Sequence, residues 1–222
     1  MTELLLLLIY SVPIAALLYT LINKKYRRHF LVLKIICSTC FLILSFLFAF
    51  KGSSMEYYIY FFPAFFMCFL GDVFLGLFNQ SKKKHYFIIG TLFFLTGHIF
   101  FITACSKIKS LDKYDFIFPI VIILLFPFFI KKKRLTIGKL KPFVYIYAFF
   151  ISFLFSKCVL MFWNTGTRQT ALLAIGSLLF LISDTLILFL YFHRNHRWST
   201  HGINLATYYY GMFFLALSLL YI

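Results

Sequence analysis

Two aspartates lie inside hydrophobic stretches of this sequence, and they are the first candidates for chemistry. Asp72 lies in FFMCFLGDVFLGLF and Asp184 in IGSLLFLISDTLILFL, and each follows a small residue. A carboxyl at membrane depth is costly, so such residues face a protein interior or a water-filled cavity and usually mark a functional site. We therefore expect Asp72 and Asp184 to act together. The alternative is a structural role, with each aspartate hydrogen-bonded across helices.

Four further polar residues stand in or beside the hydrophobic stretches. His98 lies in GTLFFLTGHIFFITA, Lys34 lies near the start of the second stretch, and Asn204 and Tyr208 share one face of the last. We expect these four side chains to bind or orient a substrate. The competing interpretations are a hydrogen-bonded core histidine for His98 and an inner-leaflet anchor for Lys34.

Composition assigns the chain to the membrane proteins. It is 63% hydrophobic and only 13% charged, so it is expected to be an all-α, polytopic membrane helix bundle. A hydrocarbon core of ~30 Å needs about 20 apolar residues per helix. Residues 1–222 are therefore predicted to form a single eight-helix transmembrane domain. The predicted spans are 3–22, 31–50, 57–78, 85–106, 115–130, 142–163, 171–192 and 202–222.

The basic residues predict the orientation. The loops near 23–34, 79–84, 131–141 and 193–201 hold 16 of the 22 Lys and Arg, and they hold no Asp or Glu. The positive-inside rule places these loops in the cytoplasm and both termini outside. The net charge of +16 is thus explained by topology, and no nucleic-acid partner is expected. The membrane is expected to be a bacterial cytoplasmic membrane.

The other face holds fewer charges of both signs. Its residues are Lys51, Lys107, Lys109, Lys113 and Arg168, with Glu3, Glu56, Asp112 and Asp115. Lys157, deeper in the sixth span, is expected to extend toward the outer headgroups, with pairing to an acid as the alternative.

The two aspartates are expected to lie at a similar depth in the membrane. The third and seventh spans run in the same direction, and both aspartates lie roughly 9–12 Å from the inner boundary at ~1.5 Å per residue. They are therefore expected to converge on a polar pocket that opens toward the inner leaflet.

Metal chemistry is not predicted. The five cysteines lie in apolar spans, and we interpret them as small packing residues, so no disulfide framework is expected. Three histidines in HRNHRWSTH suggest zinc, but two arginines accompany them, which favours contact with lipid headgroups. A membrane zinc hydrolase of the ceramidase type would need several deep histidines, and only His98 is deep.

The aspartate motifs and GTLFFLTGHIFFITA together resemble the lysoplasmalogenase family, the YhhN-like membrane proteins. That family has a Gly-Asp followed by leucines, then a Gly-rich span with a histidine, then a Ser-Asp in the seventh span. Here these are Gly71-Asp72, the span of His98, and Ser183-Asp184. One departure is that the family often has Lys-Pro near the second span, whereas Lys34 is followed by Ile35.

The resemblance implies a hydrolase that cleaves the vinyl ether bond of lysoplasmalogens, a class of lysophospholipid, without cofactor or metal. Asp72 and Asp184 would then be the catalytic acid/base pair. Membrane lipids are the other expected contacts, and the oligomeric state is left open. The alternative function is a proton-coupled transporter or channel for a small solute or lipid, because intramembrane Asp and His serve proton relays equally well.

Overall fold

The computed structural model describes residues 2–193 and 198–222, which are mainly helical and include no strand. Eight helices within these residues are long and apolar enough to cross a membrane, which confirms the predicted fold class and number of spans. They are α1 (Thr2–Ile22), α2 (Phe30–Lys51), α3 (Met55–Ser81), α4 (Lys84–Ile108), α5 (Ile117–Lys132), α6 (Lys141–Thr165), α7 (Arg168–Phe192) and α8 (Trp198–Leu217).

Short connections make neighbouring helices antiparallel. Four 3-10 turns accompany them: η1 (Lys24–His29), η2 (Lys113–Phe116), η3 (Gly138–Leu140) and η4 (Ser218–Tyr221). Between α6 and α7, Gly166 has φ +62°, a left-handed conformation that glycine adopts without steric cost. The hydroxyl of Thr167 then accepts a hydrogen bond from the backbone N–H of Thr170 and caps the start of α7.

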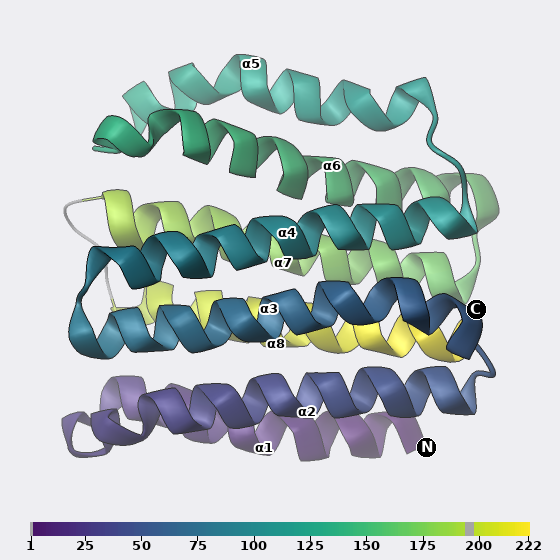
Figure 1. Cartoon of the computed structure of the whole chain (residues 1–222), viewed down its shortest axis with the longest axis horizontal. Coiled ribbons are helices and arrows are strands. Elements are labelled where there is room, and N and C mark those ends of the chain that lie inside the picture. Colours follow the sequence, from purple (N-terminus) through teal and green to yellow (C-terminus); the bar gives the residue numbers. More distant parts are fainter. Residues whose placement is uncertain (1, 194–197) are drawn as a thin grey trace.

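The helices form two layers (Figure 1). In one layer α2, α3 and α4 lie side by side, and in the other α1, α8, α7 and α6 do. Helix α5 packs on the outer side of α6 at the edge of the bundle. The aspartate-bearing helices α3 and α7 are thus both flanked by neighbours, which buries their polar side chains between the layers.

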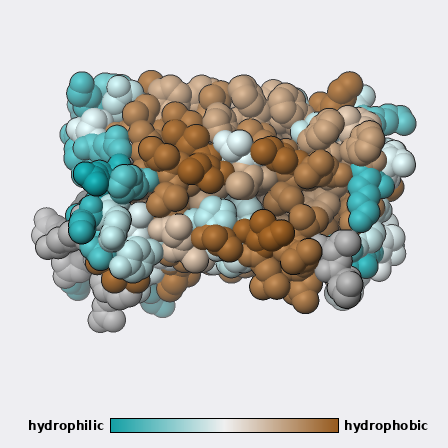
Figure 2. Space-filling view, turned by 90° about the horizontal axis from the view of Figure 1, so that it is seen from below, coloured by the Kyte–Doolittle hydropathy of each residue, from teal (hydrophilic) through white to brown (hydrophobic). Residues whose placement is uncertain are grey.

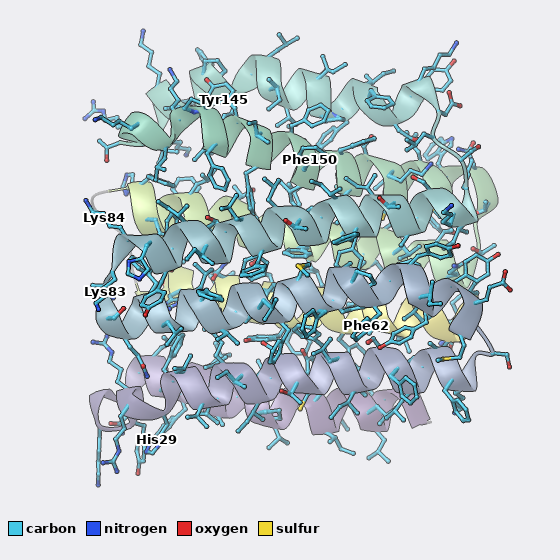
Figure 3. The ribbon with its side chains drawn as sticks, viewed as in Figure 1. His29, Phe62, Lys83, Lys84, Tyr145 and Phe150 are labelled. Carbon is cyan, nitrogen blue, oxygen red and sulfur yellow. The ribbon has the colours of Figure 1, made fainter. Side chains whose placement is uncertain are left out.

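Both ends of the bundle are polar and its middle is apolar. Figure 2 shows hydrophobic residues over the centre of one face and hydrophilic residues at its two ends, the distribution expected for a bilayer-spanning protein. His29, Lys83 and Lys84 lie at the same end in Figure 3, so η1 and the α3–α4 connection share that end. Figure 1 places both termini at the other end.

The positive-inside rule predicts that the basic end is cytoplasmic. A cysteine introduced at Gln80, in the α3–α4 connection, should therefore react with a membrane-impermeant maleimide only after the cells are permeabilised. A cysteine introduced at Lys109, in the α4–α5 connection at the other end, should react in intact cells. The reverse pattern would show that the orientation is wrong.

Glycines allow α7 and α8 to approach closely. A Cβ added at Gly176 would lie 2.9 Å from the backbone N of Leu215 and 3.0 Å from the carbonyl oxygen of Gly211. Such spacing leaves no room for a methyl group, because backbone atoms cannot move aside as a flexible side chain can. Small residues at helix contacts are the usual means of close packing in membranes.

Gly176→Ala should therefore destabilise the bundle by about 1–3 kcal/mol, the usual cost of overpacking. The matched control is Gly202→Ala in α8, where the new Cβ would lie 3.9 Å from a leucine methyl. Thermal unfolding in detergent measures both variants. Equal midpoints for the two would show that α7 and α8 are not held as closely as described.

Candidate functional site

Asp72 is the centre of a buried polar cluster formed by α2, α3 and α8. Its Oδ1 lies 2.7 Å from the ammonium of Lys34, and its Oδ2 accepts hydrogen bonds from Ser38 at 2.5 Å and Tyr208 at 2.8 Å. Lys34 is 4% exposed and Asp72 is fully buried. Tyr209 adds a hydrogen bond to the carbonyl oxygen of Lys34. A buried carboxylate needs such partners, because water cannot solvate it.

The sequence of α2 explains half of this cluster. Lys34 and Ser38 are four residues apart and therefore lie on one face of the helix, turned toward Asp72. Gly76, one turn after Asp72 on α3, carries no side chain, and a Cβ there would clash with the Leu31 side chain of α2. Helix α3 can thus lie close to α2, so that Lys34 reaches inward.

Asp184 is the centre of a second cluster formed by α4, α6 and α7. Its Oδ2 lies 2.9 Å from Nε2 of His98 and accepts a hydrogen bond of 2.9 Å from the hydroxyl of Tyr147. The same Nε2 lies 3.3 Å from the Tyr147 hydroxyl, so the three groups form a closed triangle. The ring of Phe180 packs against His98 with its centroid 4.6 Å away.

The two ring nitrogens of His98 have different surroundings. Nε2 faces the Asp184 carboxyl and the Tyr147 hydroxyl. Nδ1 is buried and has no hydrogen-bond partner among the described residues. His98 therefore holds Asp184 through Nε2.

A cavity of about 360 Å³ lies beside Asp184, between α4, α5, α6 and α7. Its polar lining residues are Asp184, Tyr147, Thr91 and Thr185. Aliphatic and aromatic side chains form the rest, among them Phe87, Phe126, Ile151 and Leu188. Asp184 thus presents a carboxyl to a space suited to a hydrocarbon chain.

The expectation of one polar pocket shared by both aspartates is not met by this cavity, which Asp184 lines and Asp72 does not. Asp72, His98, Asn204 and Tyr208 are not among its lining residues. The physical reason is that each carboxyl is satisfied by its own neighbours, Lys34 for Asp72 and the His98–Tyr147 pair for Asp184.

Aromatic rings join the two clusters. Tyr208, which donates to Asp72, packs edge-on against Phe94 and Phe180 with centroids 5.5 and 5.4 Å away. Phe180 in turn contacts His98. The Asp72 cluster thus holds Tyr208 against Phe180, the ring that packs on His98 in the Asp184 cluster.

The structure brings Lys34 and Tyr208 to Asp72, and His98 to Asp184. Asn204 contacts neither aspartate: its amide donates to the carbonyl oxygen of Ser183 at 2.8 Å and to the Ser183 hydroxyl at 2.9 Å. It therefore links α8 to α7 one residue before Asp184. Of the histidine-containing loop, residues 194–197 lie outside the described part of the chain.

A third buried acid was not foreseen. Asp115, assigned from the sequence to the outer loops, is 2% exposed and lies 3.0 Å from Nζ of Lys157. The expectation that Lys157 extends to the outer headgroups is wrong, because it is 1% exposed and also donates to the carbonyl oxygen of Ser110 at 2.7 Å. This pair joins η2 to α6 at the end opposite the basic loops.

Metal ligation finds no support in the described residues, which include no group of three or more His, Cys, Asp or Glu able to hold an ion. The five cysteines are free, as the sequence predicted.

The fold and the two clusters define an integral, multi-pass membrane protein with carboxyl groups buried between its helices. The model of the YhhN family matches residues 29–219, so the chain belongs to the YhhN family. The matched range runs from the start of α2 to η4 and includes both aspartates. No curated protein and no solved structure matches the chain.

Proposed function

We propose that this protein hydrolyses the vinyl ether bond of lysoplasmalogens, releasing a fatty aldehyde and a glycerophospho-base. The observation that carries the proposal is the Asp184 carboxyl at the edge of a largely apolar cavity of about 360 Å³. Such a cavity suits the alkyl chain of a lipid, and the carboxyl supplies the proton that this reaction requires. Membership of the YhhN family is consistent with hydrolase activity.

The reaction begins with transfer of a proton to carbon. The carboxylic acid of Asp184 donates its proton to the vinyl carbon farther from the ether oxygen, and an oxocarbenium ion forms at the other carbon. The resulting carboxylate stabilises this cation electrostatically and then accepts a proton from the attacking water. The hemiacetal that forms collapses to the aldehyde and the glycerol hydroxyl, so water is the only co-reactant.

Tyr147 and His98 hold the Asp184 carboxyl in place. Both contact Oδ2, which leaves Oδ1 without a hydrogen-bond partner among the described residues. We assign proton transfer to Oδ1 for that reason. Because Oδ2 is fixed from two directions, the carboxyl is pre-oriented, which reduces the cost of reaching the reactive geometry.

Asp72 does not line the cavity, so we assign it a positioning role in place of the direct one expected from the sequence. Its bond to Tyr208 fixes a ring that packs on Phe180, which contacts His98. Loss of Asp72 should therefore act through His98 on Asp184.

The experiment is mass spectrometry of the purified protein incubated with a lysoplasmalogen. The wild type should release free fatty aldehyde, and the saturated ether analogue, which has no double bond to protonate, should remain intact. Absence of aldehyde from a folded wild-type sample would contradict the proposal.

One observation favours the transporter alternative. The Lys34–Asp72 ion pair is buried in the bundle, and intramembrane ion pairs of this kind occur in proton-coupled carriers. Proteoliposomes that show proton-coupled flux dependent on Asp72, with no aldehyde release, would establish transport in place of hydrolysis.

A further inference from the structure

A second cavity lies at the basic end of the bundle, between η1, α3, α7 and α8. Its volume is about 820 Å³, and the polar side chains that line it include Arg27, Arg28, Lys82, Asn79 and Gln80. We refer to it as the basic cavity. Its guanidinium, ammonium and amide groups come from two separate parts of the chain, which the fold brings together at one end of the bundle.

The cations of the basic cavity have no acidic partner among the described residues. The ion pairs that the structure describes involve Lys34, His98, Lys157 and Arg168, and none includes Arg27, Arg28 or Lys82. The four loops at this end contain no Asp or Glu. Three positive charges around one hollow favour an anion there.

Three aromatic rings that contact one another border the basic cavity and the cavity beside Asp184. Tyr191 and Phe78 line the basic cavity, and Phe87 lines the other. Their ring centroids lie 4.7 Å apart for Phe87 and Tyr191, 5.6 Å for Phe78 and Tyr191, and 5.5 Å for Phe78 and Phe87. One side of this three-ring layer is charged and the other is apolar, which matches a molecule with a polar head and a hydrocarbon chain.

The spacing along α7 also fits such a molecule. Asp184 and Tyr191 are seven residues apart, so they are about 10 Å apart along the helix axis. The glycerol and ether bonds between the phosphate of a lysoplasmalogen and its reacting carbon cover a comparable length when extended.

We infer that the basic cavity binds the phosphodiester headgroup of a single-chain phospholipid, with Arg27, Arg28 and Lys82 around the phosphate. Arginine suits this role because its planar guanidinium donates two parallel hydrogen bonds to phosphate oxygens. Asn79 and Gln80 supply further amide donors, and the three-ring layer contacts the glycerol. The vinyl ether then lies near Asp184. The choice of lipid rests on the proposed function, but the phosphate site does not.

The test measures binding to the purified, detergent-solubilised protein, with a probe that cannot react. The probe is 1-O-hexadecyl lysophosphatidylcholine, a saturated ether lipid. Arg27→Gln/Arg28→Gln should weaken its binding roughly 10- to 100-fold, the range for losing hydrogen bonds to a charged group. The matched control is Lys132→Gln/Lys133→Gln, which removes two exposed charges from the same end but outside the cavity and should leave affinity unchanged.

Two further ligands identify the source of the phosphate. Hexadecylglycerol, which lacks the phosphate, should bind wild type at least about tenfold more weakly than the probe. Inorganic phosphate should not displace the probe at equal concentration. If hexadecylglycerol bound as tightly as the probe, or if the arginine variant kept full affinity, the headgroup site would be wrong. If inorganic phosphate displaced the probe, the basic cavity would be a site for free phosphate, and its assignment to a lipid headgroup would be wrong.

Failure of the inference and failure of the proposed function give different results. A wild type that releases aldehyde, with an arginine variant whose KM is unchanged, contradicts only the headgroup site. A wild type that binds the probe through these arginines but releases no aldehyde supports the headgroup site and contradicts the hydrolase.

Discussion

Asp184→Asn is expected to lower the rate of vinyl ether hydrolysis by at least about 10²-fold, the usual effect of removing a positioned acid or base. Asparagine has nearly the same shape and can still accept hydrogen bonds from Tyr147 and His98, so the bundle should remain folded. It has no proton acidic enough to transfer to carbon. Aldehyde release per folded protein, with folding followed by size-exclusion chromatography, measures the effect.

The neighbours of Asp184 provide graded controls. His98→Gln and Tyr147→Phe each remove one group that holds Oδ2, and both should lower the rate less than Asp184→Asn because the acid itself remains. Asp72→Asn should also lower the rate less, once corrected for the folded fraction. If Asp72→Asn proved the more damaging change per folded molecule, Asp72 would be the carboxyl that meets the substrate.

Breaking the Lys34–Asp72 pair from one side should produce the largest loss of stability. Lys34→Met removes the ammonium that lies 2.7 Å from Asp72 and leaves a fully buried carboxylate with only hydroxyl donors. One-sided loss of a buried ion pair costs about 3–5 kcal/mol, because the remaining charge is uncompensated. Unfolding of the detergent-solubilised protein by heat or denaturant measures this loss.

The paired substitution separates charge from packing. Lys34→Met/Asp72→Asn removes both charges and should recover most of the stability, since the cost comes from the unpaired charge. Lys83→Met, an exposed lysine at the same end, should change stability by no more than about 0.5 kcal/mol. A Lys34→Met variant as stable as the wild type would show that Asp72 and Lys34 are not a charge pair in the folded protein.

The spans and the central aspartates were predictable because the membrane imposes simple rules. Long apolar runs must be helices, and the loop charges fit an even number of them. Asp72, Asp184 and His98 were found because a polar group in such a run is rare. A polar residue in an apolar run can be recognised from the sequence around it, without knowing which helices are in contact.

The partners were harder to predict because they come from helices that are not neighbours in sequence. Tyr147 is one of 15 tyrosines and resembles those expected at a membrane interface. Its role depends on α6 packing against α4 and α7, which the sequence does not reveal. Ser38 had a usable signal, because it lies one helical turn after Lys34. Asp115 was misassigned since it lies at a span boundary, where only the position of Lys157 decides its burial.

The sequence also could not predict that Asp72 and Asp184 belong to separate clusters, because this too depends on which helices pack together. Equal depth was inferred from residue counts along α3 and α7, and depth says nothing about the direction in which a side chain points. Asp72 faces α2 and α8, whereas Asp184 faces α4 and α6. The two carboxyls therefore have different partners, and of the two only Asp184 borders the cavity of about 360 Å³.

Proton transfer from Asp184 to carbon is tested most directly by running the reaction in D2O and locating the deuterium. The wild type should release an aldehyde with one deuterium on the carbon next to the carbonyl, and Asp184→Asn should release essentially none. Unlabelled aldehyde kept in the same D2O with the protein corrects for exchange by enolisation. An aldehyde without deuterium at that carbon beyond this correction, or equal labelled product from Asp184→Asn, would show that Asp184 is not the proton donor.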